Sequence, residues 1–334
     1  MALNWGILGA GRIARDFILA LKSLPDGENK VVAVGSSSEA RAKIFAEENG
    51  IPKSYGSYEE LTQDPAVQVV YVAGVTSAHA RSSKLALNNG KHVLCEKAFA
   101  MNLKEAKEVL DLAKEKKLFL MEAMWSRFLP PYIYLQEQLG KKAIGEVSVA
   151  MATFGSKMDG KPRVYDKSLG GSVLLDIGIY TLTFADIVFN GEKPEKIVAT
   201  GHLFDSGVDH TVSVTLLFSG RRIAQLIFTA GVALSNTASV TGSGGTIHLE
   251  SPFHCTTKLT SPNGVKEFPL PDLEHPSNFV NSAGLRYEID AARESILSGE
   301  IENDLMPHST TIRIMQYMDE IRKQLGVEFD QDAL

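Results

Sequence analysis

The chain has 334 residues, of which 44% are hydrophobic and 22% charged, a composition typical of a globular protein large enough for two domains. The formal net charge of -6 argues against nucleic acid as a partner, because phosphate binding requires clustered lysines and arginines. The sequence predicts neither a signal peptide nor a membrane-spanning run, so we expect a cytoplasmic protein without a membrane partner. Its 2 distant cysteines predict no disulfide framework, and its 8 scattered histidines predict no metal site.

The N-terminal segment Asn4–Ala14 has the pattern of a buried strand, a glycine turn and a helix that continues to about Leu24. The turn has the form G-x-G-x-x-A, in which Gly9 allows a tight turn, Gly11 lets the backbone approach a diphosphate, and Ala14 lets helix and strand pack closely. The amides at the helix N-terminus would then bind phosphate oxygens. A glycine turn can also arise from packing alone, so the context decides. The predicted cofactor-binding residues of this turn are Gly9, Ala10, Gly11, Arg12 and Ile13.

Strands and helices alternate after this turn, as they do in a parallel, doubly wound sheet. Further strands are predicted at 30–35, 69–73, 92–95 and 119–122, and helices at 38–49, 78–89 and 102–116. Ser38 is predicted to cap the first of these helices. Because this whole context agrees with the glycine motif, we predict an α/β Rossmann domain over residues 1–125.

The residues after the second predicted strand select the cofactor, since an acidic side chain there would bind the 2′-hydroxyl of NAD. This chain has Gly35-Ser36-Ser37-Ser38 instead, and Arg41 follows on the next helix turn, where it could pair with a 2′-phosphate. NADP is therefore predicted in preference to NAD, with Ser36, Ser37 and Arg41 among its contacts. The alternative is that Arg41 is a solvated helix residue beside an ordinary serine-rich turn.

Two groups of polar residues are candidates for chemistry. Lys97 follows the strand 92–95, at the carboxyl edge of the sheet where ligands bind, although a lysine at a strand end is more often solvated. Asp176 and Tyr180 are four residues apart in an apolar segment and would share one face of a helix. Spacing alone favours the simpler interpretation, in which Asp176 caps the helix and Tyr180 is a core tyrosine with a satisfied hydroxyl.

From residue 146 onward the pattern changes to short strands and hairpin turns, so residues 126–334 are predicted to form a substrate-binding and oligomerisation α+β domain. We expect an open, mainly antiparallel sheet with a helix at 180–188 on one face and strands at 146–153, 195–203, 211–218, 222–229, 236–241 and 246–250. Both faces of this sheet are partly apolar, which predicts a homodimer formed sheet to sheet. The alternative is that loops and C-terminal helices at 285–298 and 307–325 cover the second face.

Four segments together resemble the Gfo/Idh/MocA oxidoreductases over nearly the full length of the chain: WGILGAGRI at 5–13, LCEK at 94–97, MEAMWSRF at 121–128 and GGSVLLDIGIY at 170–180. Within that family, YGSYEEL at 55–61, LDIGIY at 175–180, KPEKI at 193–197 and LSNTASV at 234–240 look like the dimeric dihydrodiol dehydrogenases, which also oxidise D-xylose with NADP. The resemblance implies that Lys97 and Tyr180 act at the reacting hydroxyl and that Asp176 orients the substrate or the lysine. Many relatives carry histidine in place of Tyr180, so the tyrosine points to this subgroup.

Two positions depart from the pattern of these relatives. The common Glu-Lys-Pro is Glu96-Lys97-Ala98 here, which removes the fixed φ of proline beside Lys97. Ser37 stands where the close relatives have an arginine, which leaves Arg41 as the main candidate for binding a 2′-phosphate. Glu96, Lys97 and His79 complete the predicted cofactor contacts. His79 matches a position near the nicotinamide in the subgroup, although a histidine at a helix start could equally be structural.

The reaction that the resemblance implies is oxidation of a D-xylose-like sugar, or of a trans-dihydrodiol, by hydride transfer to the nicotinamide. Tyr180 would accept the hydroxyl proton, and Lys97 would stabilise the alkoxide. Two alternatives remain: a keto- or anhydro-sugar reductase, because hydride transfer is reversible, and a non-enzymatic NADP-binding regulator, because fold does not fix function. The predicted substrate contacts, which could equally be ordinary core residues, are Trp125, Arg127, Phe128, Tyr165 and Asp176.

Overall fold

The computed structural model describes residues 2–158 and 160–333, and the chain divides into two compact units. The first unit contains Met1–Ala100, Lys104–Phe128 and Leu270–His308. The second unit contains Met101–Leu103, Leu129–Pro269 and Ser309–Leu334. The segment Leu270–His308 therefore groups with the N-terminal part of the chain, whereas a single division after residue 125 had assigned it to the second domain.

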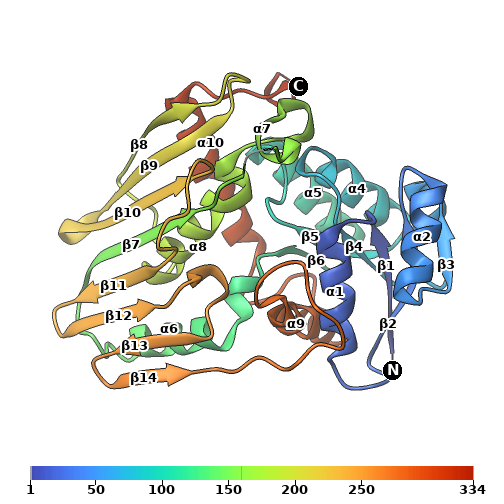
Figure 1. Cartoon of the computed structure of the whole chain (residues 1–334), viewed down its shortest axis with the longest axis horizontal. Helices are drawn as coiled ribbons and strands as arrows, with labels where there is room; N and C mark the ends of the chain where they lie inside the picture. Colours follow the sequence, from blue (N-terminus) through green and yellow to red (C-terminus); the bar gives the residue numbers. More distant parts are fainter. Residues whose placement is uncertain (1, 159, 334) are drawn as a thin grey trace. The chain divides into compact units, whose positions relative to one another are not determined.

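The first unit is built on a six-stranded sheet with the strand order β3-β2-β1-β4-β5-β6 (Figure 1). Its strands are β1 (Leu3–Leu8), β2 (Asn29–Gly35), β3 (Lys53–Tyr55), β4 (Val69–Val72), β5 (His92–Glu96) and β6 (Leu120–Ala123). Every neighbouring pair is parallel, which confirms the predicted doubly wound fold, and only the short edge strand β3 was missing from the prediction. The strand order reverses between β1 and β4, so ligands are expected at the carboxyl ends of these strands.

The helices of this unit fix the glycine turn to the sheet. They are α1 (Arg12–Lys22), α2 (Glu39–Asn49), α3 (Tyr58–Gln63), α4 (Thr76–Asn88), α5 (Leu103–Lys116, apart from its first residue) and α9 (Leu285–Leu297). The predicted cap of α2 is confirmed, because the Ser38 hydroxyl accepts a hydrogen bond from the Arg41 backbone N–H at 3.4 Å. The buried ring of Phe17 on α1 stacks on that of Tyr71 on β4, with 3.8 Å between centroids. Aromatic packing therefore holds α1 against the strand beside the switch point.

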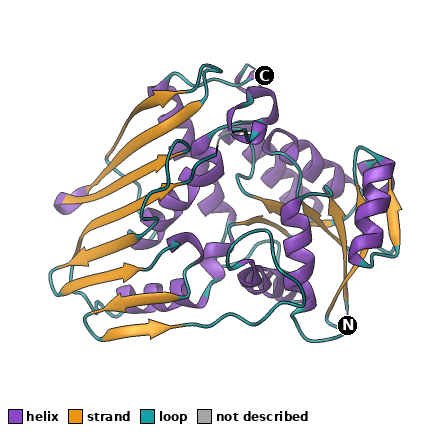
Figure 2. Cartoon of the chain, in the orientation of Figure 1, coloured by secondary structure: helices purple, strands orange, loops and turns teal. Residues whose placement is uncertain are grey.

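The second unit is built on an eight-stranded sheet with the order β14-β13-β12-β11-β7-β10-β9-β8 (Figure 2). Its strands are β7 (Val147–Gly155), β8 (Lys196–Leu203), β9 (Asp209–Phe218), β10 (Arg222–Thr229), β11 (Ala238–Gly242), β12 (Gly245–Leu249), β13 (Lys258–Ser261) and β14 (Gly264–Glu267). Among the described strands of this sheet, only β7 and β10 pair in parallel, so the open, mainly antiparallel architecture is confirmed. Strands β13 and β14 extend the sheet beyond the predicted strands.

Helix α8 (Ile179–Val188) covers part of one face of this sheet, where it packs directly on β7 and β10. The other helices of this unit are α6 (Pro130–Gly140), α7 (Pro162–Tyr165) and α10 (His308–Leu325, apart from its first residue). The register places Ala152, Leu226 and Val214 side by side, and all three are buried. The adjacent row on the opposite face includes Met151, which is 51% exposed. One face is thus core and the other retains exposed apolar side chains.

One segment of the second unit is more apolar than the sequence analysis recognised. Lys167–Val188 spans 22 residues and is long and apolar enough to cross a membrane, so the prediction that no such run exists was wrong. However, 94% of its most apolar window is buried inside the structure. A core helix passes the same test of length and composition, and the packing of α8 on the sheet accounts for its apolar side chains.

Candidate active site

The turn between β1 and α1 has the geometry that the glycine motif predicts. Gly9 has a φ of +110°, and a Cβ atom there would lie 2.8 Å from the carbonyl oxygen of Ala73. Gly11 is the N-cap of α1, and within the described residues no side chain caps this helix. The nearest non-neighbouring atom to a Cβ built on Gly11 is 4.0 Å away, so the space beside this glycine is open. These residues fit a dinucleotide diphosphate bound by the amides and dipole of α1.

The loop after β2 brings the predicted residues Ser36, Ser37 and Arg41 together. The Arg41 guanidinium donates to the Ser37 hydroxyl at 3.1 Å, and the Ser38 backbone N–H donates to the Ser36 hydroxyl at 3.4 Å. The Tyr58 phenol on α3 lies nearby: burial raises its pKa, and the charges of Arg41 and Arg81 lower it. Arg81 on α4 is thus a second guanidinium that acts electrostatically on the Tyr58 phenol. The sequence analysis did not select it, because an arginine within a helix carries no local signal.

The loop that carries Lys97 begins at a buried carboxylate. Glu96, the last residue of β5, accepts hydrogen bonds from the Tyr71 hydroxyl and, at 3.2 Å, from the backbone N–H of Lys97. Two residues further along the loop, the Phe99 backbone N–H donates to the Glu122 carboxylate at 3.0 Å. Lys97 therefore projects from a backbone that two carboxylates hold at the carboxyl ends of β5 and β6.

His79 on α4 holds the same loop from the other side. Its Nδ1 lies 2.7 Å from the carbonyl oxygen of Ala98, and its Nε2 lies 3.2 Å from that of Gly74. Burial lowers the pKa of His79, and the hydrogen bonds to the two carbonyl oxygens raise it. The peptide bond between Lys97 and Ala98 is cis. His79 thus has a structural role in this loop, and its contact with the nicotinamide stays a prediction.

Three of the predicted substrate contacts lie in one short helical turn of the first unit. Trp125, Arg127 and Phe128 belong to the 3-10 turn Trp125–Phe128, and all three are buried. The Arg127 Nε donates to the carbonyl oxygen of Leu305. This bond joins the turn to the segment Leu270–His308, so one N–H group of the Arg127 guanidinium is hydrogen-bonded to the backbone of its own unit.

Asp176 lies in a π-helical turn of the second unit, Leu174–Gly178, which leads directly into α8. This placement contradicts the simpler interpretation that Asp176 caps a helix. Its carboxylate forms an ion pair with the guanidinium of Arg163 on α7, with 2.6 Å between Oδ1 and Nη1. Such π-helical turns are rare and are often found at functional sites.

Tyr180, in the first turn of α8, lies among aromatic rings. It is 7% exposed, and its ring centroid lies 4.9 Å from that of His254 and 5.8 Å from that of Phe154. The rings of His254 and Phe154 stack at 4.5 Å. Tyr165 lies beside Phe204, at 6.2 Å between centroids, and is 36% exposed. The sequence analysis missed Phe154 and His254, which reach Tyr180 from strand and loop segments distant in the chain.

Comparisons with known proteins assign this arrangement to a family. Residues 3–124 match the family described as oxidoreductase family, NAD-binding Rossmann fold, and residues 132–248 match the GFO/IDH/MocA C-terminal domain. The chain belongs to the Gfo/Idh/MocA oxidoreductase family. It is 45% identical to trans-1,2-dihydrobenzene-1,2-diol dehydrogenase of Danio rerio over 100% of both chains. It is 42% identical to the Homo sapiens protein of the same name over 99% of both.

Solved structures of Gfo/Idh/MocA-like architecture superpose on almost the whole chain. A 3-ketoreductase from Actinomadura kijaniata, in complex with NADP and TDP-benzene, is 26% identical with a TM-score of 0.81, covering 97% of this chain and 98% of that one. Levoglucosan dehydrogenase, in complex with NADH and levoglucosan, has a TM-score of 0.84 at 19% identity over 98% of each chain and supports the fold alone. The predicted class, a nicotinamide-dependent dehydrogenase acting on CH–OH groups, is confirmed.

In this Gfo/Idh/MocA oxidoreductase a buried carboxylate anchors the turn before Asp176. Asp209, the first residue of β9, accepts hydrogen bonds from the Ser172 hydroxyl at 2.6 Å and from the Leu174 backbone N–H at 2.5 Å. Burial raises the pKa of Asp209, and these hydrogen bonds lower it. Asp209 is therefore a positioning residue for the π-helical turn. The sequence analysis missed it because its partners lie more than thirty positions earlier in the chain.

Proposed function

We propose that this enzyme is an NADP-dependent dehydrogenase that oxidises a hydroxyl group of a D-xylose-like sugar or of a trans-dihydrodiol. The proposal rests on one observation: the phenol of Tyr180 is buried among aromatic rings, four residues after the ion-paired Asp176, in a chain related over its full length to proteins named dihydrodiol dehydrogenases. Aromatic rings suit the apolar face of a ring-shaped substrate, and a phenol suits proton exchange with its hydroxyl.

The proposed chemistry divides between the cofactor and three side chains. A nicotinamide dinucleotide held at the turn between β1 and α1 would supply the hydride acceptor. Tyr180 takes the hydroxyl proton, the Lys97 ammonium stabilises the negative charge that develops on oxygen, and Asp176 orients the substrate or the lysine. General acid–base help of this kind contributes about 10²- to 10⁴-fold to the rate.

The preference for NADP follows from the charge near the loop after β2. Arg41 donates to Ser37, Arg81 lies close enough to act on the same phenol as Arg41, and the four residues from Gly35 to Ser38 include no carboxylate. A 2′-phosphate would gain charge-assisted hydrogen bonds there, whereas the 2′-hydroxyl of NAD would lack its usual acidic partner. We expect tighter binding of NADP⁺ than of NAD⁺ by isothermal titration, and Arg41→Ala should weaken only the former. Equal affinities for both nucleotides would contradict the NADP assignment.

The catalytic roles are tested by steady-state kinetics on pentoses, hexoses, inositols and trans-dihydrodiols, with absorbance of the reduced nicotinamide as the readout. Tyr180→Phe and Lys97→Met should each lower kcat by at least about 10²-fold while the Kd for NADP⁺ stays within twofold. The matched controls are Tyr134→Phe and Lys84→Met. The Tyr134 ring packs against Phe268, and the Lys84 ammonium pairs with Glu108. A near-normal kcat in either test variant would remove that residue from the scheme.

A second candidate function is the reduction of a keto- or anhydro-sugar. The observation that favours it is the similarity to the 3-ketoreductase from Actinomadura kijaniata. The same residues would serve, with Tyr180 donating the proton instead of accepting it. Assays in both directions distinguish the candidates, and turnover in neither direction despite tight NADP binding would favour a regulator.

We also propose that the enzyme is a homodimer through the outer face of the second-unit sheet. Exposed apolar side chains on this face come from three adjacent strands: Met151, Leu217 and Ile227. An exposed apolar sheet face is normally covered. Light scattering should give about twice the chain mass of 36.3 kDa. Met151→Lys should shift it toward the monomer, while Ile44→Lys on α2 should not, and a monomeric wild-type protein would contradict the proposal.

A further inference from the structure

A buried aspartate on the cofactor-binding helix holds a loop from the far end of the sequence. Asp16 on α1 is fully buried, and its carboxylate accepts a hydrogen bond from the backbone N–H of Asn278 at 2.8 Å and from that of Phe279 at 2.8 Å. The Asn278 side-chain amide also donates to it at 2.8 Å. We call residues Pro276–Val280 the strap, and all of it belongs to the same unit as α1.

The first two turns of α1 make further contacts with the strap. The Arg15 guanidinium donates to the carbonyl oxygen of Pro276 at 2.8 Å. Arg12, the first residue of α1, has its guanidinium carbon 5.4 Å from the centroid of the Phe279 ring. The Asn278 side chain both accepts from the Arg12 Nε, at 3.4 Å, and donates to the Arg12 carbonyl oxygen, at 3.2 Å. Every one of these contacts comes from the helix turn that follows the glycine motif.

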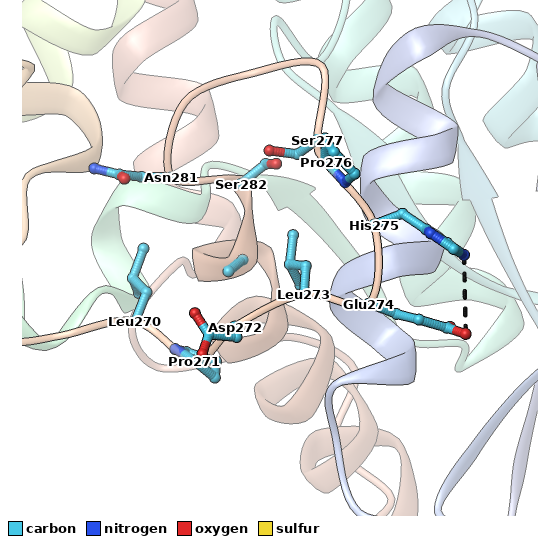
Figure 3. A pocket seen from close by; sticks show the side chains of 11 residues that line it. Leu270, Pro271, Asp272, Leu273, Glu274, His275, Pro276, Ser277, Asn281 and Ser282 are labelled. Carbon is cyan, nitrogen blue, oxygen red and sulfur yellow. Dashed lines mark ion pairs between the residues drawn. The ribbon is translucent and has the colours of Figure 1, made fainter.

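The strap forms part of a concave loop. Residues Leu270–Ser277 and Asn281–Ala283 line a cavity of about 400 Å³, and Figure 3 shows Pro276 and Ser277 on the stretch of this loop that passes α1. Phe279 and Val280 at the end of the strap are 37% and 56% exposed. The end of the strap is therefore not buried in an apolar core, and its polar contacts with Asp16, Arg12 and Arg15 fasten it to the helix.

The position of Asp16 poses an electrostatic problem that the strap solves. A carboxylate near the N-terminus of the diphosphate-binding helix would repel an anionic ligand. Three N–H groups of the strap donate to this carboxylate, and the same strap holds the Arg12 side chain by hydrogen bonding and by the Phe279 ring. Release of the strap would leave a buried charge unpaired and the Arg12 side chain unrestrained.

We infer that Asp16 and Asn278 are positioning residues for the cofactor: their contacts hold the strap on α1 and so keep Arg12 in place beside the dinucleotide diphosphate. The inference rests on the binding of the nicotinamide dinucleotide at the turn between β1 and α1. We call the three hydrogen bonds from the strap to the Asp16 carboxylate the clasp. A strap that is bound to α1 slows cofactor release, and loss of the clasp speeds this release.

The direction in which Asp16→Asn changes the affinity for NADP⁺ distinguishes this role from a purely electrostatic one. Asp16→Asn removes a negative charge near the phosphates, so a purely electrostatic role predicts tighter NADP⁺ binding. The clasp predicts the reverse, because an asparagine side chain presents an N–H₂ group to strap donors and cannot accept all three bonds. We expect a Kd for NADP⁺ raised at least tenfold by titration calorimetry, and a matching increase in the release rate by stopped-flow fluorescence.

Two further variants complete the experiment. Asn278→Ala, on the partly exposed strap, should raise the Kd in the same direction and does not depend on the tolerance of a buried site. Glu274→Gln is the matched acid-to-amide control in the same loop, since its side chain is exposed and pairs with His275 rather than with α1, and it should stay within twofold of wild type.

Hydrogen exchange tests the clasp in the wild-type protein. The amides of Asn278 and Phe279 should be protected, more strongly with NADP⁺ bound, and should exchange faster in Asp16→Asn. If the wild-type protein binds NADP⁺ and both Asp16→Asn and Asn278→Ala bind it equally well or more tightly, the role of the clasp is refuted while the cofactor site stands. A wild-type protein that binds neither NADP⁺ nor NAD⁺ would instead refute the cofactor site on which the clasp rests.

Discussion

Removal of the Asp209 carboxylate should destabilise the second unit by several kilocalories per mole. Asp209 is fully buried and accepts hydrogen bonds from the Ser172 hydroxyl and the Leu174 backbone N–H. A hydrogen bond to a charged group contributes about 1.5–3 kcal/mol, and an unpaired buried donor costs about 1–3 kcal/mol. The two bonds go to the two oxygens of one carboxylate, so their losses do not simply add. We expect Asp209→Ala to lower the free energy of unfolding by about 3–5 kcal/mol.

The assay is urea unfolding followed by two signals. Far-UV circular dichroism reports both units, whereas tryptophan fluorescence reports the first unit, since both tryptophans, Trp5 and Trp125, belong to it. The Asp209→Ala transition should move to lower urea chiefly in the dichroism signal. Asp209→Asn should lose about half as much, because an amide oxygen still accepts one of the two bonds.

Asp205→Ala, an exposed acid in the loop before β9, is the control and should change stability by less than about 0.5 kcal/mol. A loss below about 1 kcal/mol in Asp209→Ala would show that the π-helical turn holds its shape without this carboxylate, and the positioning role would be withdrawn.

Three further predictions concern the first unit. Gly9→Ala should raise the Kd for NADP⁺ at least tenfold by calorimetry, because its Cβ would lie 2.8 Å from a backbone oxygen; Gly27→Ala, also at positive φ but with nothing within 4 Å, should leave the Kd unchanged. Ser38→Ala should cost about 1 kcal/mol in urea unfolding through loss of the α2 cap, and an equal loss in Ser37→Ala would contradict this. Burial lowers the pKa of His92, so this ring makes stability fall as the pH falls from 7.5 to 5.5. Urea unfolding across this range should show a smaller fall in His92→Gln than in the wild-type protein, and an equal fall would mean that the His92 ring protonates without cost.

The Rossmann part of the fold is readable from the sequence because its determinants are local. Each strand is a short apolar run, each helix follows within a few residues, and the glycine turn between β1 and α1 carries its own spacing rule. The strands β3, β13 and β14 were missed because they are three or four residues long and have little burial to mark them. The number of strands in the second sheet was therefore underestimated while its mainly antiparallel character was correct.

The surroundings of the candidate residues were less predictable, since they depend on contacts between distant segments. Lys97, Asp176 and Tyr180 carry motif signals, but Arg163 and His254 do not, and they contact Asp176 and Tyr180 only after the second unit has folded. Likewise, nothing near Leu270–His308 in the sequence indicates that it packs with the N-terminal unit, because that grouping depends on contacts with α1 more than 250 residues earlier.

The loop after β5 bears on the departure from the Glu-Lys-Pro pattern. Proline at this position would restrict φ, whereas Ala98 leaves it to the surroundings. Those surroundings are specific: Glu96 accepts from the Tyr71 hydroxyl and the Lys97 backbone N–H, and His79 contacts the carbonyl oxygen of Ala98. Each partner lies on a buried strand or helix of the same unit, so polar contacts fix the backbone on both sides of Lys97. In this chain Glu96 and His79 therefore constrain the backbone on both sides of Lys97 without a proline at position 98.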